Sequence, residues 1–409
     1  MPWPYYCLRH LLRCFCLPLL LCILFLSGGW AQQQRQRHAG TEPAREHHTG
    51  TEPTGQLQQH RIVSYNVENL FDCSDDTLKA DDEYLPQGQR RWTPRRYHRK
   101  LNEVAKTLLA LGYEGEAPSL VGLYEVENEQ VLEALTRQTP LRSAGYRYVI
   151  TSSADVRGID VALLYRPDCF RLLSTSPLRA NLPGERPTRD VLHITGLLFP
   201  ALHDTLDLFL LHLPSRMSGA QATEPYRCHV AHAVRQAIDS LCHIRLRPCF
   251  LLMGDFNEGP NGKAITHTLR AKPLTPQPHQ RHQKDAQREQ EDTIILPSDT
   301  TLYQLLSPRR PSSLRTIKGS YKYQGHWELI DHLLASGALL HRPTALPAER
   351  PIPRLHLLPT TAEVAPLPFL LTDDRLYGGQ CPLRTYYGAT YLGGPSDHLP
   401  LVVDCCVEE

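Results

Sequence analysis

The segment CFLLMGDFN (residues 249–257) shows the pattern that decides the fold of this chain. Its five leading apolar residues predict a buried strand, and Asp255 and Asn257 follow that strand directly. A β-turn would account for the glycine, the aspartate and the asparagine, but it would not account for the apolar run that precedes them. Layered α/β proteins bind ligands at strand ends, where loops present polar groups on a rigid frame. We therefore expect this segment to contribute to a functional site.

The same pattern recurs along the chain. Three further predicted strands carry Asn66, Glu125 and His212 at or next to their C-terminal ends, and Asp397 and His398 open a strand near the C-terminus. A single residue of this kind is usually a turn or cap residue, so the argument depends on the recurrence. Carboxylate and amide oxygens are hard ligands that suit Mg²⁺, or Mn²⁺ in its place.

The remaining elements predict a layered α/β protein. Thr93 and Pro94 are a helix N-cap and first turn, apolar residues continue at helical spacing to Leu109, and Gly112 can end this helix. We also expect a short helix around residues 131–135 and a longer one over 226–241. Strands are predicted over residues 61–67, 120–125, 146–152, 159–165, 191–199, 206–212, 249–254, 329–336 and 399–404. Many strands with few helices indicate two packed sheets flanked by helices.

Composition and length allow a substantial core. The 409 residues are 41% apolar and 21% charged, which is typical of globular proteins, and a chain of this length needs neither metal nor disulfides to hold its fold. The polar segment 32–60, in which Gly-Thr-Glu-Pro occurs at 40–43 and again at 50–53, is predicted to be a disordered linker. A polar insert near 272–292 is predicted to be a loop inside one domain that spans residues 61–409.

The N-terminus has the pattern of a targeting segment. Arg9 and Arg13 precede an apolar run over residues 15–26, and small residues follow up to Ala31. This order predicts a secretory signal peptide over residues 1–31, with an N-terminal membrane anchor as the alternative. The apolar run is short for a membrane span, which needs about 20 residues. We expect an exported protein, periplasmic or extracellular, with no other membrane segment.

Charge and cysteines narrow the function classes. The net charge of +1 becomes −1 without residues 1–31, because Arg9 and Arg13 are lost. This near-neutral balance disfavours a strong binder of duplex DNA, although it allows a nuclease with a local basic groove. Eight cysteines lie beyond residue 31 and none forms a CxxC pair, which disfavours a zinc site. We expect most of them to be buried free thiols.

The order of these segments resembles the endonuclease/exonuclease/phosphatase superfamily, which includes deoxyribonucleases, exonuclease III-like repair nucleases, sphingomyelinases and inositol polyphosphate phosphatases. The resemblance extends from about Arg61 to Asp404. It implies a four-layer α/β/β/α sandwich with two packed mixed β-sheets and the site at one end. The matching blocks are SYNVENLF (64–71), EVEN (125–128), GIDVA (158–162), HLPSR (212–216), GDFN (254–257), WELIDH (327–332) and SDH (396–398).

The resemblance also implies roles for the metal ligands and the water. Glu125 is expected to be the principal Mg²⁺ ligand, with Asn66 and Asp397 beside it. The metal would neutralise charge on the scissile phosphate and its leaving oxygen. Asp255 is expected to orient or deprotonate the attacking water, and Asn257 to bond a phosphate oxygen.

Two histidines complete the implied site. His398 is expected to contact the phosphate or act as general acid or base, held by Asp331 in a carboxylate–histidine pair. His212 corresponds to a second histidine that stabilises the phosphate or protonates the leaving group. Which histidine is the base stays open. Ser215 and Arg216 are candidates for substrate binding, since an arginine fork suits phosphate oxygens.

These expectations define one main hypothesis and two rivals. The main hypothesis is a Mg²⁺-dependent, exported endonuclease acting on nucleic acid as a monomer, with no stable protein partner. Its first rival is a lipid or small-molecule phosphoesterase of sphingomyelinase or inositol-phosphatase type. A non-catalytic surface binding protein is the second rival, and it is disfavoured because every acidic and histidine position of the site is occupied. Tyr323 and Trp327 could stack on a base or pack in the core.

Overall fold

The computed structural model describes residues 58–184, 186–199, 201, 204–274, 299–306, 317–340 and 354–408. The predicted signal segment, the predicted linker up to residue 57 and most of the predicted insert near 272–292 lie outside these ranges. The chain divides into two compact units, Met1–Glu52 and Pro53–Glu409, and every described residue belongs to the second. No helix within the described ranges is long and apolar enough to cross a membrane.

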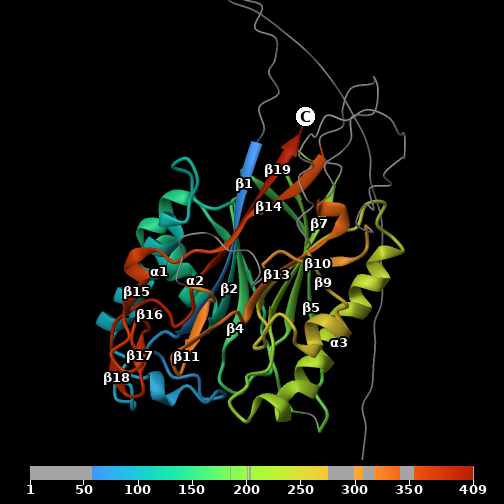
Figure 1. Cartoon of the computed structure of the whole chain (residues 1–409). Coiled ribbons are helices and arrows are strands. Elements are labelled where there is room, and N and C mark those ends of the chain that lie inside the picture. Colours follow the sequence, from blue (N-terminus) through green and yellow to red (C-terminus); the bar gives the residue numbers. More distant parts are fainter. Residues whose placement is uncertain are drawn as a thin grey trace, which may run out of the picture. The chain divides into compact units, whose positions relative to one another are not determined.

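Two large mixed sheets form the centre of the second unit (Figure 1). The first sheet contains, in spatial order, β14 (Arg354–Val364), β19 (Leu401–Glu408), β1 (Gln58–Leu70), β2 (Leu120–Val126), β4 (Asp160–Tyr165) and β3 (Arg147–Ile150). The second contains β5 (Phe170–Leu178), β6 (Val191–Leu198), β7 (Thr205–His212), β8 (Cys249–Asp255), β13 (Asp331–Ser336), β10 (Leu302–Gln304) and β9 (Lys272–Pro273). In the first sheet only β1 and β2 are parallel neighbours, and in the second sheet β7 with β8 and β10 with β9 are parallel.

Helices cover the outer face of each sheet, on the left and right of Figure 1. α1 (Pro94–Ala110) and α2 (Glu129–Arg137) pack on the first sheet, and α3 (Ala220–Cys242) packs on the second. This arrangement confirms the predicted four-layer α/β/β/α sandwich. The short elements are α4 (Gly337–Leu340), the 3-10 turns η1 (Asp82–Tyr84), η2 (Pro140–Ala144) and η4 (Pro368–Leu370), the π-helical turn η3 (Ala264–Thr268), and the small ladders β11 (Tyr321–Tyr323) with β12 (His326–Glu328), β15 (Leu371–Asp373) with β16 (Gln380–Pro382), and β17 (Tyr386–Tyr387) with β18 (Thr390–Tyr391).

Three apolar clusters account for the layers. Successive residues of a strand face opposite sides of its sheet, and in β1 both faces are buried. Ile62 belongs to the cluster between the sheets, together with Met253 of β8, whereas Val63 belongs to the cluster under α1 and α2. Phe209 of β7 belongs to the third cluster, under α3. Apolar runs on both faces of the central strands therefore require a layer on each side of both sheets.

Several boundaries differ from the sequence prediction. β1 begins at Gln58, inside the predicted linker, because it pairs along its whole length with β19, from Gln58 opposite Val407 onward. Helix α3 begins at Ala220, six residues before the predicted start, and continues through Pro225, a residue that disfavours helix interiors. Gly112 follows the end of α1 without capping it, since Leu111 is the cap.

The short strands β9 to β12 and β15 to β18 were not predicted, and neither were two longer strands, β5 and β14. β5 is an edge strand whose residues are mostly exposed, so it lacks the apolar run used to recognise a strand. β14 is an edge strand of the first sheet, and it contains Pro359. Edge strands tolerate polar residues and proline because one side of the ladder needs no partner. None of the eight described cysteines forms a disulfide, and half of them, not most as expected, are buried.

The topology places the polar strand ends at one end of the sandwich. β1 and β2 are parallel, as are β7 and β8, so each pair finishes at the same edge of its sheet. A side-chain hydrogen bond from the end of β1 to the end of β8 shows that both edges meet at the same end of the molecule. We call this the site end.

Candidate active site

Side chains from both sheets converge at the site end. Asn66 of β1 donates from Nδ2 to Oδ2 of Asp255 in β8, at 3.2 Å. Nε2 of His212 in β7 lies 3.7 Å from that same oxygen and 3.7 Å from Oε1 of Glu125 in β2. The structure therefore brings together all four strand-end residues that the sequence singled out, although they are up to 189 residues apart in the chain.

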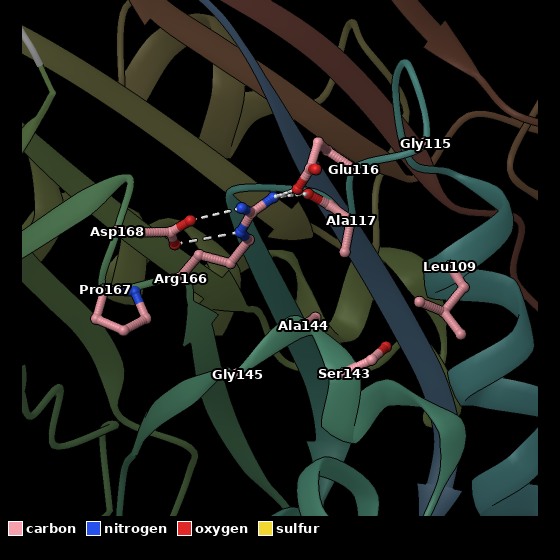
Figure 2. A pocket seen from close by; sticks show the side chains of 10 residues that line it. All are labelled: Leu109, Gly115, Glu116, Ala117, Ser143, Ala144, Gly145, Arg166, Pro167 and Asp168. Carbon is pink, nitrogen blue, oxygen red and sulfur yellow. Dashed lines mark hydrogen bonds and ion pairs between the residues drawn. The ribbon is translucent and has the colours of Figure 1, made fainter. Parts of the chain in front are cut away.

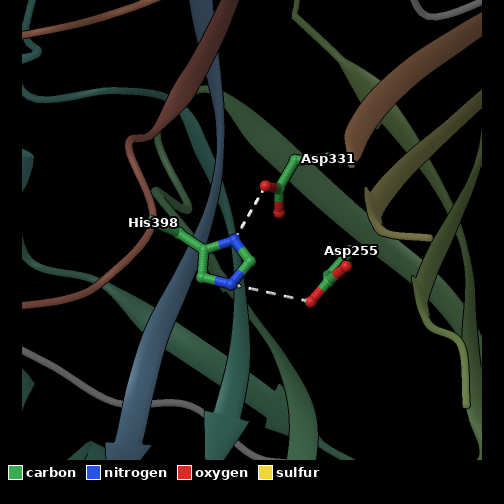
Figure 3. A group of neighbouring side chains, drawn as sticks. All are labelled: Asp255, Asp331 and His398. Carbon is green, nitrogen blue, oxygen red and sulfur yellow. Dashed lines mark hydrogen bonds and ion pairs between the residues drawn. The ribbon is translucent and has the colours of Figure 1, made fainter. Parts of the chain in front are cut away.

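A second group adds the C-terminal segment to this cluster (Figure 3). His398 Nδ1 lies 2.8 Å from Oδ2 of Asp331 in β13, and His398 Nε2 lies 3.9 Å from Oδ2 of Asp255. Ser320 donates to the same Asp331 oxygen at 2.5 Å, which fixes the carboxylate. The predicted Asp331–His398 pair is thus present, and it turns the free edge of the imidazole toward Asp255.

The two histidines experience opposite electrostatic environments. Burial lowers the pKa of His212 well below its ordinary value, and the positive charges of Arg189 and Arg157 lower it further. For His398 burial also acts to lower the pKa, but the charge and hydrogen bond of Asp331 and the charge of Asp255 hold it well above its ordinary value. At neutral pH His212 is therefore neutral and His398 is cationic.

Asp255 lies at the centre of the cluster. Its side chain is buried, and burial raises its pKa to about 7, helped by the negative charge of Asp331 and opposed by His398. Its Oδ1 accepts the backbone N–H of Asn257 at 2.8 Å, which leaves Oδ2 facing both histidines. A carboxylate with this pKa can accept a proton from water near neutral pH.

Two of the three predicted metal ligands, Glu125 and Asp397, each have one oxygen with no hydrogen bond among the described residues, whereas Asn66 Oδ1 accepts the backbone N–H of Glu68 at 3.0 Å. Oε1 of Glu125 is 3.7 Å from His212 Nε2, and Oδ1 of Asp397 is 3.9 Å from His398 Nε2, so both contacts exceed hydrogen-bond length. Their other oxygens are held: Glu125 Oε2 accepts Asn69 N–H at 2.9 Å, and Asp397 Oδ2 accepts Arg384 at 2.9 Å. Two fixed carboxylates, each with a spare oxygen, fit a divalent cation that prefers oxygen ligands.

The backbone around these ligands is strained. Glu68, Asn69 and Glu125 all have positive φ, at 47°, 52° and 67°. Residues with a Cβ rarely adopt this conformation, and such strain persists where the surrounding structure imposes it, often at functional sites. The strain lies at the point where β1 and β2 end and turn their polar residues into the cluster.

One group of three residues in the described ranges could itself hold a metal ion. It consists of Asp255, Asp331 and His398, whose ligand atoms lie within 4.8 Å of one another. A cation in this group would have to replace the 2.8 Å hydrogen bond between His398 and Asp331. We therefore interpret these three residues as the proton-handling part of the site, and Glu125 with Asp397 as the metal-holding part.

The three remaining predicted residues have protein partners. Asn257 donates from Nδ2 to the carbonyl of Leu213 at 3.0 Å, next to His212. Ser215 Oγ accepts the N–H of Met217, and the Arg216 guanidinium forms an ion pair with Glu328. Asn257 thus ties the end of β8 to the end of β7, while contacts of Asn257, Ser215 and Arg216 with a phosphate stay a prediction.

A buried network beside the site was not predicted. Lys100 of α1 is 1% exposed, and its ammonium donates to the carbonyl of Glu68 and to Oγ1 of Thr385. The Glu68 carboxylate accepts the backbone N–H groups of Thr385 and Tyr386. This network ties β1 and α1 to the segment that leads to Asp397. A lysine among the apolar positions of a helix was the one sequence signal that could have indicated it.

One surface cavity, whose lining Figure 2 shows, contains none of these residues. It has a volume of about 410 Å³ and lies where β4 ends, at Arg166. Because β4 is antiparallel to β2, this is the end of the sandwich opposite the site. Arg166 is neutralised there by Glu116 and Asp168, both at 2.6 Å, so the cavity offers no free charge to a phosphate.

The second cavity lies at the site end and has a volume of about 520 Å³. Thr188 and Asp190 line it, and Arg189 between them is buried and donates to Asp155 at 3.0 Å. Arg189 also donates to the carbonyl of His212 at 3.3 Å. None of the predicted site residues lines this cavity, and Arg189, which lies between two lining residues, connects it to the backbone of His212.

Comparisons with known proteins agree with this architecture. The profile of a family described as the endonuclease/exonuclease/phosphatase family matches residues 61–286 and 299–406. No curated protein matches the sequence. The structure of ANGEL2, a 2',3'-cyclic phosphatase in complex with adenosine-2',3'-vanadate, is similar with a TM-score of 0.51 at 14% identity, covering 86% of this chain and 97% of that chain.

Two other solved structures show lower similarity. The human Nocturnin catalytic domain with bound sulfate has a TM-score of 0.46 at 14% identity, covering 86% of this chain and 96% of that chain. A humanized D. rerio TDP2 has a TM-score of 0.47 at 12% identity, covering 85% and 98%. At such identities, the likeness to ANGEL2 shows a shared fold.

Proposed function

The chain belongs to the endonuclease/exonuclease/phosphatase family, and on that premise we propose that it hydrolyses phosphodiester bonds of nucleic acid with Mg²⁺, or with Mn²⁺ in its place. Members of this family are phosphoesterases, so hydrolysis of a phosphate ester follows from membership. The single observation that carries the finer proposal is the position of Asp255. Its Oδ2 faces Asn66, His212 and His398, each contributed by a different segment of the sandwich.

In the proposed reaction Asp255 orients the attacking water and accepts its proton. The Asn66 amide holds one carboxylate oxygen, and the N–H of Asn257 holds the other. A general base fixed in this way contributes about 10²- to 10⁴-fold to a rate. When Mg²⁺ is bound by Glu125, with Asn66 and Asp397, it supplies neutralisation of the charge on the phosphate and leaving oxygen.

The histidines contact the phosphate in this proposal. Asp331 holds His398 through Nδ1, so that Nε2 is the atom presented to a phosphate oxygen. His212 Nε2 lies beyond hydrogen-bond length from both neighbouring carboxylates, and Nδ1 has no hydrogen-bond partner among the described residues. Such an uncommitted buried imidazole suits a contact that forms only when substrate is bound.

Nucleic acid is the favoured substrate for two reasons. ANGEL2, whose fold this chain shares, is a 2',3'-cyclic phosphatase that was solved with an adenosine ligand. The ring of Tyr321, whose centroid lies 4.9 Å from that of His398, also suits a nucleotide, because aromatic rings stack on bases. We further propose that the protein is exported through residues 1–31 and acts as a monomer without a stable protein partner.

A substrate panel tests the proposal. The purified protein is incubated with single-stranded DNA, duplex DNA, RNA, sphingomyelin vesicles and inositol phosphates, in Mg²⁺, Mn²⁺ or EDTA. We expect cleavage of a nucleic acid in Mg²⁺ and Mn²⁺ and none in EDTA. Asp255→Asn is expected to lower kcat by about 10²-fold or more through loss of the base.

The matched control is Asp168→Asn, which changes a carboxylate at the opposite end of the sandwich. It is expected to retain the wild-type rate. Cleavage of sphingomyelin or inositol phosphates without any cleavage of nucleic acid would contradict the substrate assignment. A fully active Asp255→Asn variant would contradict the mechanism.

A further inference from the structure

Three exposed tyrosines lie in β11 or in segments that contact β11 or Arg384. Tyr323, Tyr377 and Tyr387 have exposed fractions of 53%, 53% and 59%, which is unusual for large aromatic side chains. Tyr321, which is partly buried, precedes them in the same region. We call these four residues the tyrosine strip.

The strip begins at the proposed active site. Tyr321 in β11 forms a β-bridge with His398, and the centroids of their rings are 4.9 Å apart. Tyr321 and Tyr323 are two residues apart in one strand, so they lie on the same face, about 7 Å from each other. The face of β11 that contacts the histidine therefore continues outward as an exposed aromatic surface.

The strip is held in place by Lys322, which lies between the two tyrosines on the other face of β11. Its ammonium forms a 2.7 Å ion pair with Asp374 and donates to the carbonyl of Gly378 at 2.9 Å. These contacts tie the β11–β12 hairpin to the turn that carries Tyr377. The two parts also pack directly, because a Cβ on Gly325 would lie 2.9 Å from Cβ of Tyr377. A surface fixed in this way loses little conformational freedom when it binds a ligand.

Arg384 connects the strip to the metal-holding part of the site. It forms an ion pair with Asp397, the candidate metal ligand, which balances its charge, and its guanidinium lies 6.0 Å from the ring of Tyr387. The net charge of +1 for the whole chain offers no extended basic groove for a duplex. Base–aromatic stacking is independent of such a groove, but it requires bases with exposed faces.

From these contacts we propose that the tyrosine strip stacks on unpaired bases next to the scissile phosphate, so that the substrate is single-stranded nucleic acid. The inference rests on the proposed function for the position of that phosphate. Tyr321 is closest to His398 and would contact the nucleotide at the reacting phosphate. Tyr323 and Tyr377 would contact bases farther along the strand.

The test compares a dT oligonucleotide with an abasic strand of equal length, which has the same backbone charge and no bases. Hydrolysis of both is measured for wild type, Tyr323→Ala, Tyr377→Ala and Tyr323→Trp. We expect each alanine variant to raise KM for the oligonucleotide about fivefold or more, with a smaller effect on the abasic strand. Tyr323→Trp is expected to restore the oligonucleotide KM, since its ring can still stack.

Tyr113→Ala serves as the control, because Tyr113 is a partly exposed tyrosine that packs on Arg61 at the other end of β1. It is expected to leave both KM values unchanged. If the alanine variants at 323 and 377 change both KM values equally, or change neither, the proposed strip is overturned. Binding to phosphatidylcholine–sphingomyelin vesicles that depends on Tyr323, with no effect on oligonucleotides, would also overturn it.

Binding without hydrolysis separates the strip from the proposed function. In EDTA, fluorescence anisotropy of a labelled dT oligonucleotide measures affinity alone. If wild type hydrolyses no nucleic acid but Tyr323→Ala still weakens this binding, the strip stands and the proposed reaction fails. If hydrolysis proceeds and Tyr323→Ala binds as well as wild type, the reaction stands and the strip fails.

Discussion

His212 and His398 are chemically identical residues with opposite protonation behaviour in this fold. His212 is surrounded by Arg189 and Arg157, whereas His398 has Asp331 at its Nδ1 and Asp255 near its Nε2. When two titratable groups in one site have pKa values pushed apart, their roles differ. Both positions could be recognised from the sequence, but the difference between them depends on neighbours from other segments of the chain.

His332 should make the protein sensitive to acid. It is buried next to the site, its Nε2–H donates to the carbonyl oxygen of Glu258 at 2.9 Å, and burial lowers its pKa from 6.5 to about 4. The unfolded chain therefore binds this proton more readily than the folded one. The neutral imidazole therefore contributes to the free energy of unfolding. This contribution is fully present above pH 6.5 and is lost as the pH falls toward 4. Across that window the loss is about 3 kcal/mol.

This prediction is checked by urea unfolding at pH 7 and pH 4. The drop in unfolding free energy between the two is expected to be about 3 kcal/mol smaller in His332→Gln than in wild type. His98→Gln, which changes an exposed histidine on α1, should show the wild-type drop. An equal drop in His332→Gln and wild type would contradict the prediction.

At the scale of elements, α1 contributes more than packing, because Lys100 joins it to the site. Lys100→Met would keep the side-chain length but leave the Glu68 carbonyl and the Thr385 hydroxyl without their donor. Breaking a buried charged contact by removing one partner costs about 3–5 kcal/mol. We therefore expect unfolding free energy, measured by chemical denaturation, to fall by about 3 kcal/mol.

The same helix offers a matched control. Lys106 is about half exposed and pairs with Glu103 at 3.7 Å, so Lys106→Met should change stability by less than about 1 kcal/mol. If both variants are equally stable, the buried network does not hold α1 to the segment before Asp397. We expect Lys100→Arg to be less stable than the wild type as well, because a guanidinium is larger than the buried space around an ammonium.

Central elements could be predicted better than edge elements. β1, β2, β7 and β8 have apolar residues on both faces, so their positions follow from simple apolar runs. The edge strands were harder to recognise, because β5 is mostly exposed and the apolar start of β14 is interrupted by Pro359. The cap of α2 is local in sequence, since Asn128 accepts the N–H of Val131 at 2.9 Å.

At the scale of the whole molecule, the proposal of export makes its own prediction. Expression of the full chain in a bacterial host should yield a periplasmic protein whose N-terminus, measured by mass spectrometry, begins near Gln32. We expect cleavage there because Arg9 and Arg13 are followed by the apolar run, and small residues then lead up to Gln32. Deletion of residues 1–31 should retain the protein in the cytoplasm. A full-length chain that stays in the membrane fraction would instead indicate an N-terminal anchor.

By itself, the sequence determined the sandwich and the residue types of its site. Strand periodicity is local, and polar residues at strand ends are recognisable without knowing which strands are neighbours. Only the tertiary structure decided which of these residues meet. The hydrogen bond from Asn66 to Asp255 joins two sheets, and Lys100 reaches Thr385 across 285 residues. Such contacts, and the pKa shifts and aromatic surface that depend on them, arise from strand order and burial, which no local pattern encodes.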